Sequence, residues 1–462
     1  MSQDETYVAS FTLPVAVEDA FAYHDRPGAL DRLIPPWENA KVERSDGSLA
    51  VGSRVVLKTW LFGVPIRWTA EHTLYEPPKM FADTQVSGPF AKWDHQHIFD
   101  AAGDEQCVIQ DRISYRLPMG FVGKLFGGGM ARRTIESMFA YRHHVTRYDL
   151  ELMAHYQQEP LTVAVSGSTG LVGSSLSAML TLLGHQTKAI VRSQTGNENE
   201  IAAWGNESES TKFHGVDAVV HLAGKSIASG RWTDEIKQEI RDSRVIKTRQ
   251  LCERLAALEC KPRVLVCASA TGIYGDRSDE VLTEESKSGN DFLSRVAAEW
   301  EEACQPAIDA GIRVVNARLG LVLSPKGGAL QKMLLPAKFA GGSLGNGKQW
   351  WSWIALDDVL GGIYHAIQTS DLQGPVNFVS PDPIQNRDFA NVLGRVVSRP
   401  AIFPAPAFAL RAVLGEMANA LLLSSTRAEP TRLQSTNYKY RFTDLETTLR
   451  YYLGRDRLES AE

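Results

Sequence analysis

The sequence predicts an α/β protein: a Rossmann-type doubly wound parallel sheet preceded by an α+β helix-grip domain. Three features of the chain lead to this prediction. The amino-terminal third reads as short strands followed by one long amphipathic helix. From Leu161 onward, apolar runs of strand length alternate with helix-length segments. A loop with three evenly spaced glycines separates the first of those runs from the helix after it.

The length of the chain predicts several domains, because 462 residues exceed one core of about 150 residues. We expect a helix-grip domain at residues 1–155, a linker at 156–160 and an NADP-binding sheet domain at 161–398. Residues 399–462 contain one apolar helix and a polar tail. They are too few for a separate core, so we expect them to pack on the sheet domain.

The composition narrows the class of protein. The formal net charge is −5 and no basic stripe stands out, which argues against a nucleic-acid partner held by phosphate neutralisation. The five cysteines form no Cys-x-x-Cys pair, as expected for free thiols in a reducing cytoplasm. The acidic amino terminus is not a signal peptide, and no apolar run reaches the roughly 18 residues of a membrane span. We therefore expect a soluble cytoplasmic protein.

The first segment has the pattern of a strand meander closed by a helix. The stretches "GSRVVLKTWLF" and "VPIRWTAEHTLYEPP" are rich in β-branched and aromatic residues and end in turn residues. Alternation in "PFAKWDHQHIFD" puts His95 and His97 on one strand face with Trp93 and Phe99. After Gly129, an apolar stripe at helical spacing predicts one long helix across the sheet. Such a fold often leaves an apolar cavity, so we expect an apolar ligand there.

Three histidines of this segment could in principle bind zinc, namely His95, His97 and His72, which lies on another predicted strand. No cysteine or carboxylate of suitable spacing accompanies them in the sequence. We therefore expect no metal here and interpret the imidazoles as the polar wall of a ligand pocket or as core packing.

The second segment alternates strands and helices. Its apolar strand-length runs are "LTVAVSG", "QTKAIVR", "DAVVHLAG", "PRVLVCASA" and "IRVVNARLG". The glycine loop "VSGSTGLVGSSL" follows the first run directly and opens a helix, which is the context that predicts a dinucleotide site. Its first glycine permits a tight turn, its second lets backbone N–H groups approach a pyrophosphate, and its third lets helix and strand pack closely. The predicted cofactor-binding residues of this loop are Gly167, Ser168, Thr169, Gly170, Leu171, Val172 and Gly173.

The choice of dinucleotide depends on the end of the second strand. Arg192 stands where NAD sites usually place a carboxylate for the ribose 2′-hydroxyl. A guanidinium suits a 2′-phosphate, so we predict NADP(H), a solvated surface arginine being the alternative. A helix farther along presents Glu239 and Arg244, which could reach the cofactor or face solvent. Further expected cofactor contacts, in "HLAG", are Leu222, Ala223 and Gly224.

The words "SGSTGLVGSSL", "VVHLAGKSI", "SATGIYGD", "ARLGLVLSPKGGAL" and "GNGKQWWSWI" carry a family resemblance. From Leu161 onward the chain resembles the extended short-chain dehydrogenase/reductase superfamily, in its atypical nucleoside-diphosphate-sugar epimerase-like branch. The tail from Pro404 to Leu433 is similar to the small carboxy-terminal domain of that branch. The first segment is similar to START-like (SRPBCC), polyketide-cyclase-type domains. The resemblance implies an NADP-binding Rossmann-type sheet, a small-molecule substrate at its carboxyl edge, and the homodimer that extended family members often form.

The acid–base residues of that superfamily are missing. Its Tyr-x-x-x-Lys pair is replaced here by Phe292 and Val296, and Ala270 stands at the place of its catalytic serine. The resemblance therefore implies a cofactor site whose chemistry has changed or lapsed. The hydroxyl groups that remain as candidate catalytic residues are those of Ser269, Thr271 and Tyr274.

Two further motifs allow structural or functional interpretations. The tryptophans of "GNGKQWWSWI", at 350, 351 and 353, could cover a planar ligand or fill a domain interface. Asp357 and Asp358 are expected to cap the following helix.

Two functions fit the sequence. The first is an NADP(H)-dependent oxidoreductase or epimerase-like enzyme acting on a small organic molecule, with a lipophilic-ligand module at its amino terminus. The second is a non-catalytic dinucleotide sensor, favoured by Phe292 and Val296. Consumption of NADPH in the presence of carbonyl or quinone compounds would distinguish the two.

Overall fold

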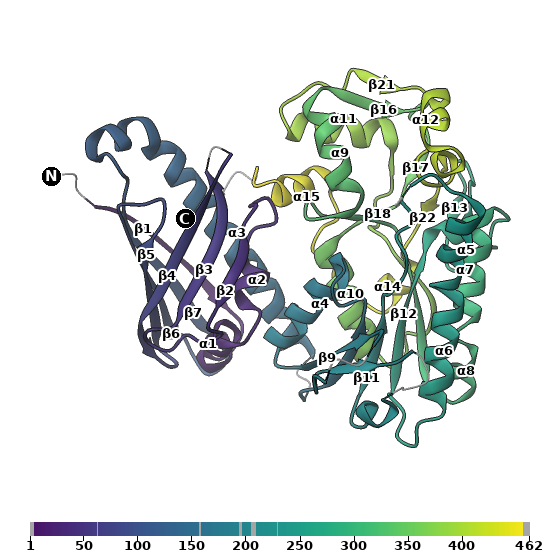
Figure 1. The fold of residues 1–462 in the computed structure, drawn as a ribbon, viewed down its shortest axis with the longest axis horizontal. Helices are drawn as coiled ribbons and strands as arrows, with labels where there is room; N and C mark the ends of the chain where they lie inside the picture. The colour runs from purple at the N-terminus through teal and green to yellow at the C-terminus, as the bar shows by residue number, and fades with distance from the viewer. Residues whose placement is uncertain are drawn as a thin grey trace. The chain divides into compact units, whose positions relative to one another are not determined.

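The structure is a computed structural model, drawn in Figure 1. The residues it describes are 4–61, 63–156, 159–193, 196–204, 209–228 and 230–455. The chain divides into two compact units: residues 1–159 with 178–184 and 451–462, and residues 160–177 with 185–450. Residues 157 and 158 of the expected linker lie outside the described residues.

The amino-terminal unit is one antiparallel sheet with a long helix. Its strands are β1 (Glu5–Leu13), β2 (Lys41–Ser45), β3 (Arg54–Leu61), β4 (Val64–Glu76), β5 (Met80–Ser87), β6 (Lys92–Ala101) and β7 (Cys107–Arg116). They pair in the order β1-β7-β6-β5-β4-β3-β2. Its helices are α1 (Val17–Asp25), α2 (Ala29–Leu33) and α3 (Gly120–Tyr156). The predicted strand meander and its closing helix are confirmed.

The sheet of this unit buries one face against α3. Alternate residues of β6 and β7 point inward, since side chains of a strand alternate between faces. The core between sheet and helix consists of Trp93, Ile113, Tyr115, Ile135 and Phe139. Register shifts in the pairing of β4 with β5 add local bend and twist, as β-bulges do.

The second unit contains a parallel sheet. Its strands are β8 (Thr162–Ser166), β9 (Gln186–Val191), β10 (Glu200–Ala202), β11 (Ala218–His221), β12 (Val264–Ala270), β14 (Arg313–Leu319) and β19 (Gly374–Phe378). They lie in the order β10-β9-β8-β11-β12-β14-β19, and all neighbours pair in parallel. The chain runs outward from β8 to β10 and then returns to β11, so the order reverses between β8 and β11. Ligands of such sheets bind at this reversal, beyond the carboxyl ends of the strands.

Helices cover this sheet. In chain order they are α4 (Leu171–Leu182), α5 (Asp234–Asp242), α6 (Val245–Ala256), α7 (Phe292–Glu302), α8 (Gln305–Asp309), α9 (Gly328–Lys338), α10 (Leu356–Gln368) and α11 (Asn386–Val396). In Figure 1, α7 and α10 lie on opposite sides of β12, which both contact. The central strands β11 and β12 are accordingly buried on both faces, as parallel strands are. The predicted doubly wound sheet is confirmed.

The carboxy-terminal residues up to 450 belong to this second unit. Their helical elements are α12 (Ala407–Leu414), α13 (Glu416–Ala418), a π-helical turn η3 (Asn419–Leu423), α14 (Thr431–Ser435) and α15 (Leu445–Tyr452). Four short strand pairs complete the unit: β13 (Val281–Leu282) with β22 (Arg427–Ala428), β15 (Leu321–Leu323) with β18 (Trp353–Ala355), β16 (Gly341–Leu344) with β21 (Phe403–Ala405), and β17 (Trp350–Trp351) with β20 (Ile384–Gln385). Two short 3₁₀ turns are η1 (Ser210–Phe213) and η2 (Thr271–Tyr274).

Asp358 fastens the carboxy-terminal segment, and the expectation that it caps its own helix is wrong. Both Asp357 and Asp358 lie inside α10, which begins one residue earlier. The Asp358 carboxyl accepts hydrogen bonds from the backbone N–H groups of Arg441 and Phe442, at 2.7 and 3.0 Å. Burial raises its pKa to about 7. The sequence signal for a cap was misleading, because these N–H groups come from a segment about 80 residues away.

Within the described residues, no helix combines the length and the apolar character needed to cross a membrane.

Candidate functional site

The glycine turn lies at the carboxyl end of β8, next to the reversal of strand order. Gly167 has a φ of +68°, and the N–H of Gly170 donates to its carbonyl oxygen at 2.9 Å. A Cβ atom on Gly173 would lie 2.2 Å from that same oxygen, and one on Gly167 would lie 3.0 Å from the Leu222 backbone. The turn is therefore folded so tightly against helix and neighbouring loop that only glycine fits at these two positions.

The open side of the turn faces outward. Thr169 and Gly170 are exposed, and Ser168, Leu171 and Val172 are partly so. Helix α4 begins here, and the first N–H groups of a helix are a favourable place for a phosphate. The backbone around 167–173 thus has the shape and polarity that a pyrophosphate group requires.

A buried hydrogen-bond chain holds the adjoining loop. Ser166 Oγ accepts the N–H groups of Leu222 and Ala223, at 3.0 and 3.2 Å. It lies 2.6 Å from His221 Nδ1. Because two N–H donors occupy the oxygen lone pairs, the hydroxyl proton points to His221 Nδ1. His221 Nε2 therefore carries the ring proton and donates to Thr248 Oγ1 at 3.0 Å.

His221 stays neutral in this chain. It is completely buried, and burial lowers its pKa to about 4. This chain of hydrogen bonds requires a neutral imidazole, since Nδ1 accepts a hydrogen bond from Ser166 and Nε2 donates one to Thr248. Neither Ser166 nor His221 was predicted to be functional, although both lie inside quoted motifs, "VSGSTGLVGSSL" and "HLAG".

Glu239 and Arg244 contact the loop of residues 222–225. The single helix expected here is interrupted, with α5 ending at Asp242 and α6 starting at Val245. Arg244 donates to the carbonyl oxygens of Lys225 and Ile240, at 3.0 and 3.1 Å. Its guanidinium also lies within 3.5 Å of a Cβ position on Gly224, and Glu239 forms an ion pair with Lys225. Both residues therefore contact the 222–225 loop.

Arg192 lies at the same edge of the sheet. It follows the last residue of β9 directly and is exposed. In the strand pairing, Ser166 is opposite Ile190, so Arg192 lies two residues beyond the level of Ser166. In Rossmann-type sheets the adenosine ribose of a dinucleotide binds beyond the end of the second strand.

At the positions of the missing acid–base pair, Phe292 and Val296 pack against other residues of the second unit. Val296 is buried in α7, and the ring of Phe292 lies 5.3 Å from that of Trp232. Lys237 Nζ lies 5.3 Å from the centre of the Phe292 ring, on its face. Neither replacement side chain can transfer a proton.

Two of the three predicted catalytic hydroxyls belong to a buried polar network. Ser269 Oγ donates to Glu301 at 2.7 Å, and Glu301 forms an ion pair with Arg318 at 2.8 Å. Arg318 donates to the Tyr274 hydroxyl at 2.9 Å, which itself donates to Asn377 Oδ1 at 2.7 Å. Burial raises the pKa of Tyr274. These contacts already use the hydroxyls of Ser269 and Tyr274.

Thr271 differs from these two. It stands at the carboxyl end of β12, is only half-buried, and its hydroxyl makes a long 3.4 Å contact with the Leu319 carbonyl oxygen. Of the three predicted catalytic hydroxyls, that of Thr271 therefore has the longest hydrogen bond to the protein.

The tryptophans near 350 contribute to packing. Trp353 is fully buried and its indole N–H donates to the Asp382 carbonyl oxygen at 2.8 Å. Trp351 is buried against Phe389. Trp350 is partly exposed and carries the Arg427 guanidinium over its ring at 4.4 Å. The two buried rings fill the core of the second unit.

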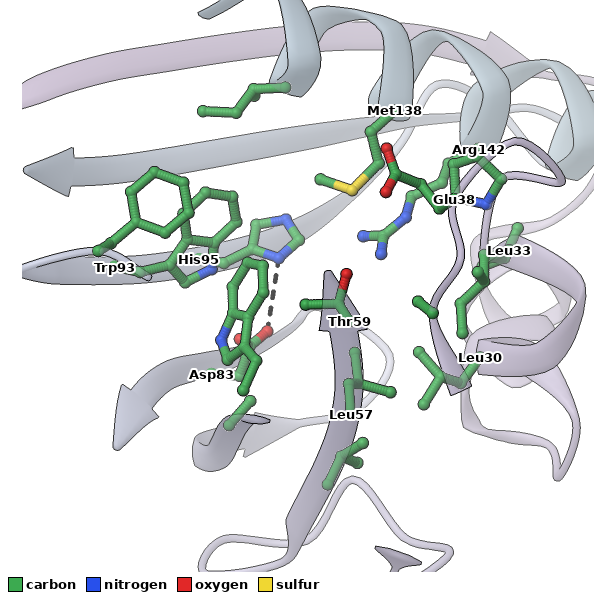
Figure 2. A pocket seen from close by; sticks show the side chains of 18 of the residues that line it. Leu30, Leu33, Glu38, Leu57, Thr59, Asp83, Trp93, His95, Met138 and Arg142 are labelled. Carbon is green, nitrogen blue, oxygen red and sulfur yellow. Dashed lines mark ion pairs between the residues drawn. The ribbon is translucent and has the colours of Figure 1, made fainter. Parts of the chain in front are cut away.

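A second candidate site is a cavity of about 920 Å³ inside the amino-terminal unit. Its wall is mostly apolar, and Figure 2 shows Leu30, Leu33, Leu57 and Met138 around it. This volume lies in the range of natural small-ligand pockets, about 300–1,000 Å³. Polar side chains gather on its inner wall, including Asp83, His95, Asp111, His97, His143 and Arg142.

These polar groups contact one another. Asp111 lies 3.1 Å from His95 Nε2, 2.7 Å from His97 Nδ1 and 2.6 Å from His143 Nε2. Although burial opposes its ionisation, the imidazoles hold the pKa of the Asp111 carboxyl well below its usual range. Asp83 lies 3.4 Å from His95 Nδ1. The premise that no carboxylate accompanies the histidines is therefore wrong, because neighbouring strands supply two.

Matches to protein families agree with this division of the chain. Residues 163–378 match the NAD dependent epimerase/dehydratase family, and residues 13–139 match the polyketide cyclase/dehydrase and lipid transport family. Residues 405–451 match a domain of unknown function. The resemblances inferred from the sequence motifs are thereby confirmed.

Three similar proteins illustrate the relationship. An epimerase family protein of Mycobacterium bovis is 40% identical over 293 residues, which cover 63% of this chain and 96% of that protein. The crystal structure of a nucleoside-diphosphate sugar epimerase from Corynebacterium glutamicum has a TM-score of 0.80 and 32% identity, covering 98% of this chain and 91% of that one. A human epimerase family protein, solved with NADPH, has a TM-score of 0.58 and 30% identity over 63% of this chain and 99% of its own.

Proposed function

Because this chain belongs to the epimerase family, we propose that its second unit binds NADP(H) and acts as an oxidoreductase on a small organic substrate. The observation that carries the proposal is the glycine turn at the reversal of strand order, where a Cβ on Gly173 would lie 2.2 Å from the Gly167 carbonyl oxygen. A bound nicotinamide supplies or accepts a hydride. Backbone N–H groups around 167–173 would hold the pyrophosphate.

The preference for NADP(H) over NAD(H) is supported by Arg192. It is exposed at the edge where the adenosine ribose is expected, and a guanidinium can pair with a 2′-phosphate through two hydrogen bonds. The human relative whose structure contains NADPH supports the same choice.

A route for the proton is supported by Thr271. Since Phe292 and Val296 cannot exchange protons, and Ser269 and Tyr274 already have buried partners, the Thr271 hydroxyl is the remaining candidate near the strand ends. It would pass a proton between substrate oxygen and solvent, which makes simple carbonyl or quinone reduction a better fit than epimerisation.

Two measurements test this proposal. Calorimetric titration should give tighter binding for NADPH than for NADH, and NADPH absorbance should fall when a suitable carbonyl or quinone compound is added. Thr271→Val should lower turnover while NADPH affinity is kept, and Thr271→Ser should restore it. Absence of heat with both nucleotides would contradict the cofactor assignment itself.

A dinucleotide sensor without turnover is the second candidate. It is favoured by the packing of Phe292 and Val296 and by the fixed hydroxyls of Ser269 and Tyr274. Tight NADPH binding with no consumption across a broad panel of compounds would establish the sensor over the enzyme.

For the amino-terminal unit, we propose that the cavity binds a small, largely apolar ligand. Its volume of about 920 Å³ and its leucine and methionine lining support this role. An apolar fluorescent dye that binds with one-to-one stoichiometry, and is displaced by apolar competitors, would test it.

A further inference from the structure

We infer that the amino-terminal unit contains a binding site for a divalent transition-metal ion of the zinc type, formed by Asp83, His95 and His97. The site would lie on the inner wall of the cavity. It is independent of the cofactor site of the second unit, so the two can fail separately.

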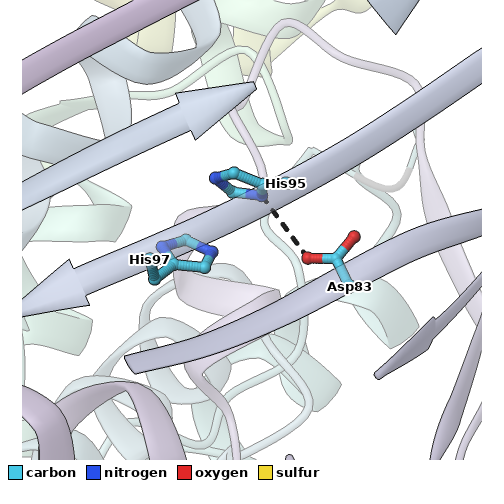
Figure 3. A group of neighbouring side chains, drawn as sticks. All are labelled: Asp83, His95 and His97. Atoms are coloured by element: carbon cyan, nitrogen blue, oxygen red, sulfur yellow. Dashed lines mark ion pairs between the residues drawn. The ribbon is translucent and has the colours of Figure 1, made fainter. Parts of the chain in front are cut away.

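Adjacent strands bring the three side chains together. Asp83 of β5 is directly opposite His95 of β6 in the antiparallel pairing, and His97 lies two residues along the same strand face. One donor atom from each lies within 4.8 Å of the others. Figure 3 shows the Asp83 carboxylate and the two imidazoles grouped between the strands.

The spacing of Asp83 and His95 suits a shared ion better than a hydrogen bond. Asp83 Oδ2 and His95 Nδ1 are 3.4 Å apart, beyond the usual N–H···O range of about 2.7–3.2 Å. Two ligand atoms that are each about 2.1 Å from a tetrahedral metal lie roughly 3.4 Å from each other. The distance is therefore already that of two ligands of one ion.

Asp111 provides the outer support that metal-bound histidines usually have. His95 Nε2 is 3.1 Å from Asp111 Oδ1 and is hydrogen-bonded to it. With the proton on Nε2, the lone pair of His95 Nδ1 points toward Asp83. A carboxylate behind the imidazole fixes this tautomer and raises the basicity of the ligand nitrogen.

The cavity wall also has polar atoms without hydrogen bonds. In the described part of the amino-terminal unit, the buried side-chain nitrogens that lack a hydrogen bond are Trp68 Nε1, His72 Nδ1, His97 Nδ1 and Arg142 Nε. All four residues line the cavity. His97 Nδ1 lies 2.7 Å from Asp111 Oδ1 without a hydrogen bond to it.

The ligand types favour a divalent transition metal. Two histidines and one carboxylate are a ligand set for zinc or ferrous ions, and they leave coordination positions open. Those positions face the cavity, where an oxygen atom of a ligand or water would complete the coordination.

The test uses the full-length chain with Cys260→Ser, because Cys260 is an exposed free thiol that could bind metal by itself. The protein is treated with chelator, loaded with Zn²⁺, dialysed and analysed for metal per chain. We expect one equivalent of Zn²⁺, and a Co²⁺-loaded sample with visible absorption bands of imidazole-ligated cobalt. Less than one tenth of an equivalent would overturn the inference.

Variants assign the site. Asp83→Asn and His95→Ala should each weaken Zn²⁺ binding at least about 100-fold, and Asp111→Asn should weaken it about tenfold, as loss of a supporting carboxylate does. His24→Gln serves as matched control, since His24 lines the same cavity but donates from Nδ1 to the Ala20 carbonyl oxygen at 2.8 Å. Circular dichroism shows whether each variant is folded. If His95→Ala does not fold, the near-isosteric Asp83→Asn alone tests whether Zn²⁺ binds at this site. Stoichiometric binding that survives in Asp83→Asn would overturn the assignment.

Discussion

The two candidate sites both contain buried polar side chains, but these side chains have different partners. At the carboxyl edge of the parallel sheet, Ser269, Glu301, Arg318 and Tyr274 bond to one another in a closed network. In the amino-terminal unit, His97 and other residues on the cavity wall keep nitrogen atoms without a hydrogen bond. Leaving a buried polar atom unpaired costs about 1–3 kcal/mol, so such a cluster points to a ligand that pairs with it.

This difference in hydrogen bonding indicates which groups of each unit are available to a ligand. A Rossmann-type sheet can obtain its reactive group from a bound dinucleotide, so its own polar side chains can serve the structure. The cavity of the amino-terminal unit instead has imidazoles and carboxylates of the protein itself in its lining. The predictions below test each side of this comparison, beginning with the largest effect.

Gly173→Ala should reduce NADPH affinity most. Its Cβ would lie 2.2 Å from the Gly167 carbonyl oxygen, so the turn must open. Strain of about 3 kcal/mol from such overpacking corresponds to roughly 100-fold in affinity. Calorimetric titration of NADPH measures it.

Gly129→Ala is the control for this change. A Cβ there would meet no atom within 4 Å, and Gly129 lies in α3 of the other unit, so we expect NADPH affinity to be unchanged. Equal losses in the two variants would show that the turn is not what positions the cofactor.

The pH dependence of stability should depend on His221. Burial lowers its pKa from 6.5 to about 4, so the unfolded chain takes up the proton first as pH falls. Its contribution to stability is complete above the unfolded pKa and is lost as pH decreases from there toward the folded pKa. Between about pH 7.5 and about pH 5 this amounts to roughly 2 kcal/mol.

His221→Gln isolates this contribution, because an amide can still accept from Ser166 and donate to Thr248 but does not titrate. Urea unfolding at both pH values should show a smaller acid-induced loss of stability in the variant than in the parent chain. Identical pH dependence would mean that folding does not lower the pKa of His221.

Local patterns were sufficient to predict much of the second unit. The glycine spacing, the strand before it and the helix after it are contiguous, so the turn of 167–173 and the sheet around it could be predicted. The bracing of the loop by Arg244 could not, because it depends on where the helix is interrupted. Asp358 was misread for a similar reason, since its partners at 441 and 442 are remote in sequence.

The cluster of Asp83, His95, His97 and Asp111 in the amino-terminal unit shows more clearly what a single sequence does not predict. The two-residue spacing of His95 and His97 predicted that they share a strand face. Asp83 and Asp111 join them only because β5 and β7 flank β6 in this register. Register depends on turn lengths and on the packing of the whole sheet, and a single sequence does not provide it.

Filling the cavity should weaken binding of an apolar dye. Leu57 points into the cavity in Figure 2, so Leu57→Trp should occupy part of its volume and lower dye affinity about tenfold. Leu125→Trp is the control, because Leu125 is exposed on α3. If both variants bind the dye as the parent does, the dye binds elsewhere and the cavity assignment loses its support.

The smallest expected effect concerns Arg192, which is exposed and therefore screened by solvent and salt. Arg192→Ala should weaken NADPH about fivefold and leave NADH nearly unchanged, since a solvent-exposed ion pair contributes only about 1 kcal/mol. Arg192→Lys should retain part of the preference, because it keeps the charge but loses the two-pronged hydrogen bonding. NADPH titrations at low and high salt separate the contribution of the charge from that of the hydrogen bonds. The difference in NADPH affinity between Arg192→Lys and Arg192→Ala comes from the charge and should therefore decrease as salt is added. If Arg192→Ala weakens NADH as strongly as NADPH, the residue does not bind the 2′-phosphate.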